Sequence, residues 1–260
     1  MSRAAVAVGA LGTALRRVGS RLEGWQQRAA SQSAAVFESR DALHLNRARL
    51  DHLASLDLDV DRKRVLEVGA GIGLLTGFFE ARGCRVLSTE PRAENLAEMR
   101  RRFPHRDVRP LDLDRDRDLS GIGPFDIAFC YGTLYHLAKP REALEALASA
   151  ADLLLLEACL TPGAHVDVHL VREGPSHNQA IAGVGCRPTR AWVMETLRAL
   201  WGHAYTTIDQ PDLPDFETDW LVPYKHGNHR AVFVASRAPL SCPKLTETLP
   251  DRQERIEWTR

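Results

Sequence analysis

The sequence predicts an α/β fold in which helices cover both faces of a mostly parallel sheet. From residue 65 onward, short apolar runs typical of buried strands alternate with stretches whose apolar residues recur at helical spacing. This alternation is typical of a doubly wound parallel sheet. Two further features mark one edge of that sheet, because the first predicted strand ends in three alternating glycines and the second ends in Glu90.

Each predicted element has a local reason in the sequence. Asp41 can cap a helix that carries a stripe of leucines, and Gly83 can end the helix that follows the first strand. Pro140 suits the first turn of a helix, and Thr189 can cap another. We therefore expect helices at 41–56, 72–82, 92–103, from 140 and from 189, and strands at 65–68, 84–89, 108–113, 125–130, 152–157, 204–208 and 231–235.

The same patterns divide the chain into three parts. Residues 1–38 are rich in Ala, Arg, Ser and Gln and predict a helical or mobile extension, residues 39–237 predict the main domain, and residues 238–260 predict a peripheral tail. Within the main domain, the segments 158–188 and 210–228 are rich in Gly, Pro and polar residues. Loops of this length are usually functional or disordered, so we expect these segments to form the substrate side of a site.

Composition limits the class of partner. The chain has 34 basic and 34 acidic residues, so it offers no overall positive field for RNA, although the N-terminal arm is locally basic. Its five cysteines show no metal-ligand spacing, which favours a reducing compartment, and we expect the protein in the cytoplasm. The apolar run at 4–15 is too short to cross a bilayer, so no membrane partner is expected.

The glycine loop predicts a nucleotide-like ligand that is not a dinucleotide. Glycines at 69, 71 and 73 let a backbone approach a ligand closely, and a carboxylate at Glu90 can accept both hydroxyl hydrogens of a ribose. The dinucleotide fingerprint would place its third glycine at Leu74, so that pattern fails. The charged Glu67 at the end of the strand suits a ligand with an ammonium or sulfonium group better than one with two phosphates.

Residues 67–73, with the sequence E-V-G-A-G-I-G, resemble motif I of the class I S-adenosylmethionine-dependent methyltransferases. The resemblance continues through the third and fourth predicted strands to 134–137, where L-Y-H-L is similar to a segment of several subfamilies. It covers roughly residues 40 to 237. It implies a Rossmann-like, seven-stranded sheet, mostly parallel with an antiparallel last strand, and S-adenosylmethionine as the cofactor.

The resemblance also implies roles for individual residues. Glu90 would bind the ribose, Asp112 would accept from the adenine amine, and the backbone of Leu113 would meet the adenine ring. The full set expected to bind the cofactor is Glu67, Gly69, Gly71, Gly73, Glu90, Asp112, Leu113 and Tyr131.

The acceptor is expected beyond the carboxyl ends of the strands, where open α/β sheets bind their ligands. His136 is the candidate general base, because the segment after the fourth strand lies against the transferred methyl group in the resembling enzymes; alternatively, His136 packs under the next helix. Tyr135, His177 and Arg187 are the candidate substrate-binding residues. Arg187 could bind an acidic group of the substrate or pair with an acid of the chain.

A metal site is not expected. His165, Asp167 and His169 alternate with apolar residues, so on a strand they would form one exposed polar face. An exposed polar face explains the pattern without a metal ion. The alternative is that the three side chains bind a metal.

The function predicted from the sequence is methyl transfer, most simply to an oxygen of a small polar molecule such as a saccharide or a secondary metabolite. RNA methylation is the first alternative, from the likeness of residues 135–137 and the basic arm. An NAD-dependent oxidoreductase or a nucleotide-binding module without catalysis is the second. The sequence leaves the oligomeric state open.

Overall fold

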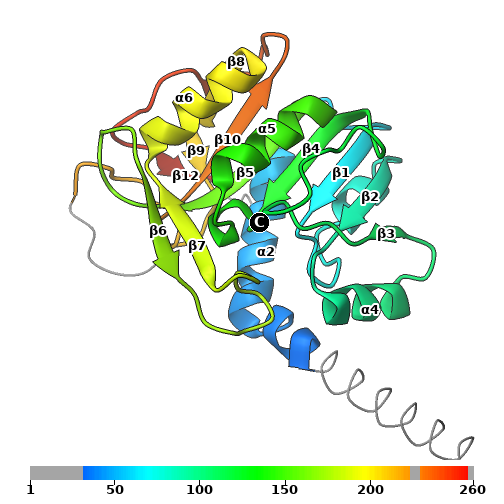
Figure 1. Cartoon of the computed structure of the whole chain (residues 1–260). Coiled ribbons are helices and arrows are strands. Elements are labelled where there is room, and N and C mark those ends of the chain that lie inside the picture. The colour runs from blue at the N-terminus through cyan, green and yellow to red at the C-terminus, as the bar shows by residue number, and fades with distance from the viewer. Residues whose placement is uncertain (1–31, 223–228, 257–260) are drawn as a thin grey trace, which may run out of the picture.

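The computed structural model describes residues 32–222 and 229–256, which form an eight-stranded sheet flanked by helices (Figure 1). The spatial order of the strands is β11-β8-β10-β5-β4-β1-β2-β3. Their bounds are β1 Arg64–Val68, β2 Arg85–Thr89, β3 Asp107–Arg109, β4 Phe125–Tyr131, β5 Ala151–Leu160, β8 His203–Thr207, β10 His229–Ser236 and β11 Leu245–Thr246.

The sheet is mostly parallel, as the sequence predicted. Strands β1 to β5 pair in parallel, whereas β10 pairs antiparallel with both β5 and β8. The structure adds one strand to the seven expected, because the segment after residue 237 returns to the sheet as β11 and pairs antiparallel with β8. Leu245 of β11 is buried, which gives this short strand an apolar anchor.

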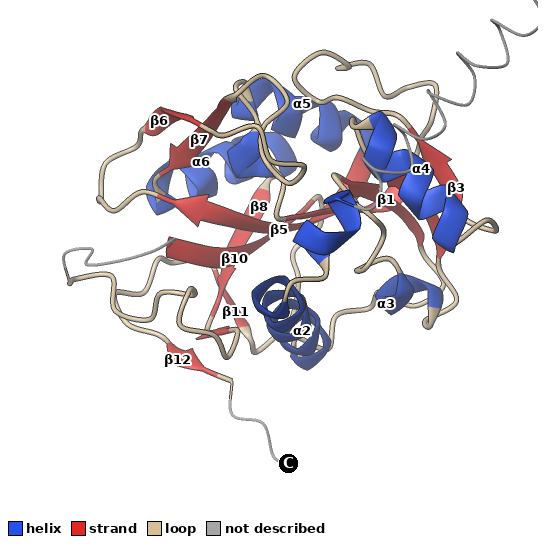
Figure 2. Ribbon diagram, turned by 90° about the horizontal axis from the view of Figure 1, so that it is seen from below, coloured by secondary structure: helices blue, strands red, loops and turns tan. Residues whose placement is uncertain are grey.

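Helices cover the sheet on both faces (Figure 2). Helices α5 (Pro140–Ala150) and α6 (Arg190–Trp201) lie on one face, and α2 (Arg40–Ser55) and α3 (Gly77–Glu80) lie on the other. Helix α4 (Ala93–Arg102) packs on Val108 of the edge strand β3, on the side of α2 and α3. Successive side chains of a strand point to opposite faces. On β4, Ala128 and Cys130 accordingly belong to the apolar cluster under α5 and α6, while Ile127 and Phe129 belong to the cluster under α2.

The helix beginnings agree with the sequence in two cases and differ in two. Pro140 lies in the first turn of α5, as expected. Thr189 caps α6, since its Oγ1 accepts a hydrogen bond of 3.2 Å from the Trp192 backbone N–H. Helix α2 is capped by Ser39 rather than by Asp41, and Leu43 of the expected leucine stripe is exposed. The helix expected at 72–82 is reduced to α3, because the glycine loop and a series of turns occupy its first half.

The long segment after β5 is ordered. β5 itself continues to Leu160, and β6 (Val168–Arg172) then pairs antiparallel with β7 (Val184–Pro188) to form the β6–β7 hairpin beside the sheet (Figure 1). A second small sheet pairs β9 (Asp209–Gln210) with β12 (Glu254–Arg255). A 3-10 helix, η1 (Leu134–His136), follows β4 and contacts β7.

Residues 32–38, at the end of the expected N-terminal extension, pack on the main domain. Residues 32–37 are helical, and the Ser33 hydroxyl donates a hydrogen bond of 2.5 Å to Asn95 Oδ1 on α4. Glu38 forms an ion pair of 2.5 Å with Arg102. The basic arm at 1–31 and part of the expected loop, residues 223–228, lie outside the described residues. Within the described ranges, no helix has the length and hydropathy required to cross a bilayer.

Candidate active site

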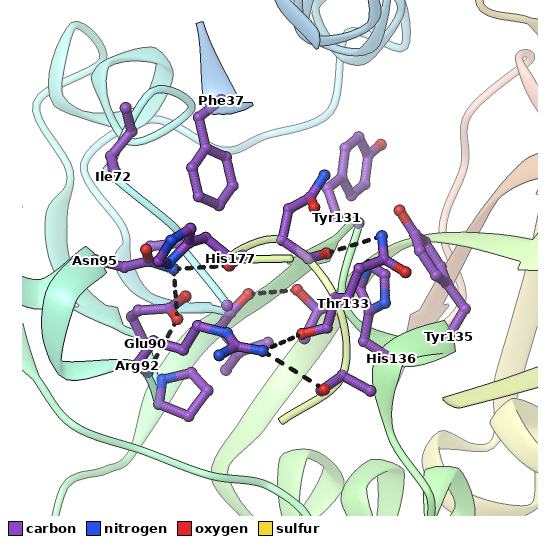
Figure 3. Close-up of a pocket in the computed structure, with 18 of the residues that line it drawn as sticks. Phe37, Ile72, Glu90, Arg92, Asn95, Tyr131, Thr133, Tyr135, His136 and His177 are labelled. Carbon is purple, nitrogen blue, oxygen red and sulfur yellow. Dashed lines mark hydrogen bonds between the residues drawn. The ribbon is translucent and has the colours of Figure 1, made fainter. Parts of the chain in front are cut away.

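A cavity lies at the carboxyl ends of β1, β2 and β4 (Figure 3). It holds about 1230 Å³ of empty space, open solvent at its mouth included. Its walls come from the glycine loop, residues 111–114, the segment after β4, the turn of the β6–β7 hairpin and α2.

The glycine loop forms one wall in a backbone conformation that favours glycine. Gly69 and Gly71 have φ of 65° and 59°, in the left-handed region. Gly69 lines the cavity, and a Cβ there would lie 2.2 Å from Thr133 Oγ1. At Gly71 a Cβ would lie 2.7 Å from the ring of Phe37. Gly73 is turned away from the cavity, toward Arg106, whose guanidinium donates to the Gly73 carbonyl at 2.6 Å.

Glu90 places a buried carboxyl group at one end of the cavity, beside Asn95 and Arg92 (Figure 3). It accepts hydrogen bonds of 3.0 Å from the backbone N–H groups of Gly71 and Arg92 and from Asn95 Nδ2. Burial raises the pKa of Glu90 to about 7. The group therefore changes its charge near neutral pH, in a position where a ligand can reach it.

Glu67 lies behind the glycine loop and does not line the cavity. It is 2% exposed, and its Oε2 accepts hydrogen bonds from Thr76 Oγ1 at 2.6 Å and from Ser88 Oγ at 2.8 Å. Burial raises the pKa of Glu67. The sequence led us to expect a ligand contact here, whereas in the structure this carboxyl group ties the turn after the glycine loop to β2.

Asp112, Leu113 and Tyr131 all line the cavity. Oδ1 of Asp112 accepts from the Asp114 backbone N–H at 3.1 Å, which fixes the carboxylate at the rim. Tyr131 is buried against Phe129, and burial raises the pKa of its phenol. The Tyr131 hydroxyl has no hydrogen-bond partner within the described residues. A buried polar atom of this kind is uncommon, and in this cavity it is available to a ligand.

His136 lies at the opposite end of the cavity from Glu90 (Figure 3). It contacts a carboxylate that was not expected from the sequence. His136 Nδ1 lies 2.5 Å from Oε2 of Glu173, which follows β6. The Glu173 carboxylate also accepts from the Ala180 backbone N–H at 2.8 Å and from Arg187 Nη1 at 3.3 Å. Burial opposes ionisation of Glu173, but the hydrogen bond from His136 and the neighbouring positive charges outweigh it and hold its pKa below the ordinary value.

A buried ionic network adjoins His136. Arg230 Nη1 donates to the Tyr135 hydroxyl at 2.9 Å and to Glu157 at 2.8 Å, and Arg49 donates to the same Glu157 carboxylate at 2.5 Å. Burial opposes ionisation of Glu157, but the two guanidinium groups outweigh it and lower its pKa. Burial also raises the pKa of Tyr135 to about 12. Since Arg49, Tyr135 and Arg230 line the cavity, this end presents fixed polar donors.

Two of the expected substrate-binding residues lie elsewhere. His177 lines the cavity at the end that holds Glu90, where its ring contacts Glu94 at 3.2 Å and its carbonyl accepts from Asn95. Arg187 does not line the cavity. Its guanidinium donates to the Tyr135 carbonyl at 3.1 Å and pairs with the Glu173 carboxylate, so the alternative expectation, an arginine paired with an acid of the chain, describes it.

Several lining or supporting residues were missed by the sequence analysis. Arg49 and Asn95 are polar residues on buried helix faces, and Arg230 is a charged residue in an apolar strand. A polar or charged residue at a position that the pattern assigns to the core indicates a buried network or a binding site, so the sequence does carry a signal for these three residues. Glu173 gave no such signal, because it lies in a polar loop whose path only the tertiary structure defines. The missed residues are Phe37, Arg49, Arg92, Asn95, Thr133, Glu173 and Arg230.

Comparisons with known proteins agree with this architecture. Residues 66–153 match a protein family described as a methyltransferase domain, whereas a comparison with curated proteins found no match. Among solved structures, the N-terminal domain of EvdMO1, crystallised in the presence of SAH and D-fucose, is 21% identical, with 76% of this chain and 84% of that domain covered and a TM-score of 0.57. The chain covers 47% of the longer EvdMO1 structure.

Magnesium protoporphyrin IX methyltransferase (ChlM) from Synechocystis PCC 6803, with bound SAM, is another similar structure. It is 14% identical, with 79% of this chain and 90% of that chain covered and a TM-score of 0.51. At these identities the likeness to the solved structures establishes a common fold.

Proposed function

We propose that the chain is a class I methyltransferase that uses S-adenosylmethionine, and that it methylates an oxygen atom of a small polar molecule with His136 as the general base. The observation that carries this proposal is the contact between His136, which lines the cavity, and Glu173, which does not line it and holds the imidazole at Nδ1. A carboxylate that holds an imidazole through Nδ1 fixes its orientation and stabilises its protonated form.

The cavity offers the groups that this cofactor requires. Glu90 would accept from the ribose hydroxyls, Asp112 and Leu113 would hold the adenine, and the backbone at Gly69 permits a close approach. The partnerless Tyr131 hydroxyl is available to a ligand in the same cavity. When bound, S-adenosylmethionine supplies an electrophilic methyl group on a sulfonium.

His136 has the ring nitrogen that the reaction needs. Nδ1 is engaged by Glu173, and Nε2 makes no hydrogen bond within the described residues. His136 would take the acceptor's hydroxyl proton on Nε2 as the oxygen forms its bond to the methyl carbon and the carbon–sulfur bond breaks to leave a neutral thioether. The resulting imidazolium would be stabilised by Glu173. Positioning of the two reacting atoms supplies much of the remaining acceleration.

A hydroxylated small molecule suits the acceptor end of the cavity. The fixed donors of Tyr135, Arg230 and Arg49 can orient hydroxyl or carbonyl oxygens of a polar acceptor. The EvdMO1 domain, which shares the fold, was crystallised in the presence of D-fucose, and this supports a saccharide as one class to test. The zero net charge of the chain counts against the RNA alternative.

The test is a methyl-transfer assay with the purified full chain, S-adenosylmethionine and a panel of saccharides, phenols and RNA. The expected result is a mass gain of one methylene on a hydroxylated small molecule and loss of that product with His136→Ala. Calorimetry with S-adenosylhomocysteine and NAD provides the second measurement. Binding of NAD alone would contradict the methyltransferase assignment, and methylation only of RNA would contradict the proposed acceptor class.

We infer that the protein works in the cytoplasm. All five cysteines are free thiols, and three of them, Cys130, Cys159 and Cys186, are buried. Thiols remain unpaired in reducing compartments, which supports the location expected from the sequence. Fractionation of the native cells tests this inference, and recovery of the protein outside the cytoplasm would contradict it.

A further inference from the structure

Three side chains of metal-binding type converge outside the cavity, just before and within β6. The imidazole nitrogens of His165 and His169 and a carboxylate oxygen of Asp167 all lie within 4.8 Å of one another. Asp167 Oδ2 is 3.3 Å from Nε2 of His169 and 3.8 Å from Nε2 of His165. None of the three residues lines the cavity, so the methyl-transfer site does not account for the cluster.

The sequence predicted that these three residues form the exposed polar face of a strand, and the structure does not show such a strand face. An exposed polar face of an amphipathic strand requires the intervening apolar residues to be buried on the other face. Strand β6 begins only at Val168, so His165 and Asp167 precede it. The side chains of Val166 and Leu170 are 49% and 61% exposed. The convergence of the three polar side chains therefore does not follow from burial of their neighbours.

The chain around the cluster is fixed at several points. Thr189, the cap of α6, donates through Oγ1 to the His165 carbonyl at 2.7 Å and through its backbone N–H to the Asp167 carbonyl at 2.9 Å. Gly163 has φ of 134°, and a Cβ there would lie 2.6 Å from the His165 ring. His169 is held in β6 opposite Arg187 of β7. Anchoring of this kind lowers the conformational entropy that a bound ion would have to overcome.

We propose that His165, Asp167 and His169 bind a divalent transition-metal ion, with Zn²⁺ as the ion to test. Two imidazoles and one carboxylate are typical ligands of Zn²⁺, which they bind at about 2.0–2.2 Å, whereas Ca²⁺ takes six to eight oxygens. Two ligand atoms of a tetrahedral zinc ion therefore lie about 3.4 Å apart. The present spacing of up to 4.8 Å needs only small rotations of exposed side chains. Solvent completes the coordination.

The bound ion would fix residues 165–169, the last residues before β6 and the first residues of that strand. This is the base of the β6–β7 hairpin, whose turn carries Glu173 and Ala180 to His136. Its role would be to stabilise this hairpin without contact with the acceptor. The proposed site does not depend on which molecule is methylated.

The test is a titration of the full chain, free of any histidine tag and treated with a chelator, with Zn²⁺ in a calorimeter. We expect one ion per chain and an affinity at least about tenfold weaker in His165→Ala, Asp167→Asn and His169→Ala, as loss of one ligand of three predicts. His105→Ala is the matched control, because this exposed histidine lies outside the cluster and should leave the affinity unchanged.

Two further measurements complete the test. Co²⁺ should give a visible absorption band with the wild-type chain and not with His169→Ala, and Zn²⁺ should raise the melting temperature of the wild-type chain but not that of the variant. Circular dichroism checks that the variants are folded. No stoichiometric binding by the wild-type chain, or equal affinity in the cluster variants and in His105→Ala, would overturn the proposal.

Discussion

His136 Nδ1 lies 2.5 Å from Glu173 Oε2 and thereby joins the segment after β4 to the turn of the β6–β7 hairpin. The carboxylate is itself held by the Ala180 backbone N–H and by Arg187. A fully held carboxylate can fix the orientation of an imidazole and stabilise its charged form. This relationship explains why a hairpin outside the main sheet belongs to the site.

Glu173→Gln should lower turnover while leaving cofactor binding intact. The substitution keeps the size of the side chain and removes its charge, so the imidazolium formed during proton transfer loses its partner. We expect kcat to fall about 10- to 100-fold, less than the roughly 10²- to 10⁴-fold contribution of a general base itself, and the affinity for S-adenosylhomocysteine to stay within about twofold. Glu145→Gln on the exposed face of α5 is the control. Unchanged kcat and pH profile would rule out the positioning role.

His136→Ala should abolish most turnover, by about 10²- to 10⁴-fold, because the acceptor proton then has no base at that position. The double variant with Glu173→Gln should be no slower than His136→Ala alone, since Glu173 acts through the imidazole. Steady-state rates of the four proteins test this cycle. Additive losses would show that the two residues act independently, and full activity of His136→Ala would assign the base role elsewhere.

Cofactor affinity should rise with pH through about 7. Burial raises the pKa of Glu90 to about 7, and ribose hydroxyls bind the ionised carboxylate, so below this pH a proton must leave before the ligand binds. At pH 6 about a tenth of the groups are ionised, so the affinity for S-adenosylhomocysteine should be about tenfold weaker than at pH 8.

Calorimetry at several pH values measures this dependence. Glu90→Gln should bind weakly at every pH and lose the slope, whereas His177→Gln, which replaces the neighbouring titratable group, should retain it. A flat profile in the wild-type protein would contradict a ribose contact at Glu90.

Gly71→Val should prevent cofactor binding and destabilise the fold. The position has φ of 59°, which costs an L residue about 1–2 kcal/mol, and a Cβ would lie 2.7 Å from the Phe37 ring. Gly121→Ala is the control, because a Cβ there meets nothing within 4 Å. Phe37→Ala should restore part of the lost stability but not the binding. Thermal melts and calorimetry decide, and normal affinity in Gly71→Val would show that the loop does not approach the ligand.

Glu157→Gln should destabilise the fold by about 3–5 kcal/mol, because it leaves two buried guanidinium groups without their shared counter-charge. Arg49 and Arg230 are both buried and both donate to this carboxylate. Urea unfolding measures the change, with Glu142→Gln on the half-exposed start of α5 as the comparison. A loss of less than about 1 kcal/mol would show that the network contributes little to stability.

The fold could be predicted from the sequence because its signals are local. Strand and helix periodicity, helix-ending glycines and helix caps each depend on only a few neighbouring residues. Thr189 caps its helix as expected, and the alternation from residue 65 gave the α/β sheet. The strand β11 was missed because two residues carry little periodicity. The cap of α2 moved from Asp41 to Ser39, since the choice between neighbouring polar residues depends on the path by which residues 32–38 reach α4.

The sequence by itself determined the class of this protein: the glycine loop, Glu90 and Asp112 follow local motifs, and all three features adjoin or line the cavity. Only the tertiary structure decided the direction of each side chain within those motifs. It turned Glu67 behind the loop, paired Arg187 with Glu173 and brought Glu173 to His136. The physical reason is that a motif fixes backbone geometry over a few residues, whereas a charged side chain takes the partner that long-range packing brings within hydrogen-bond distance.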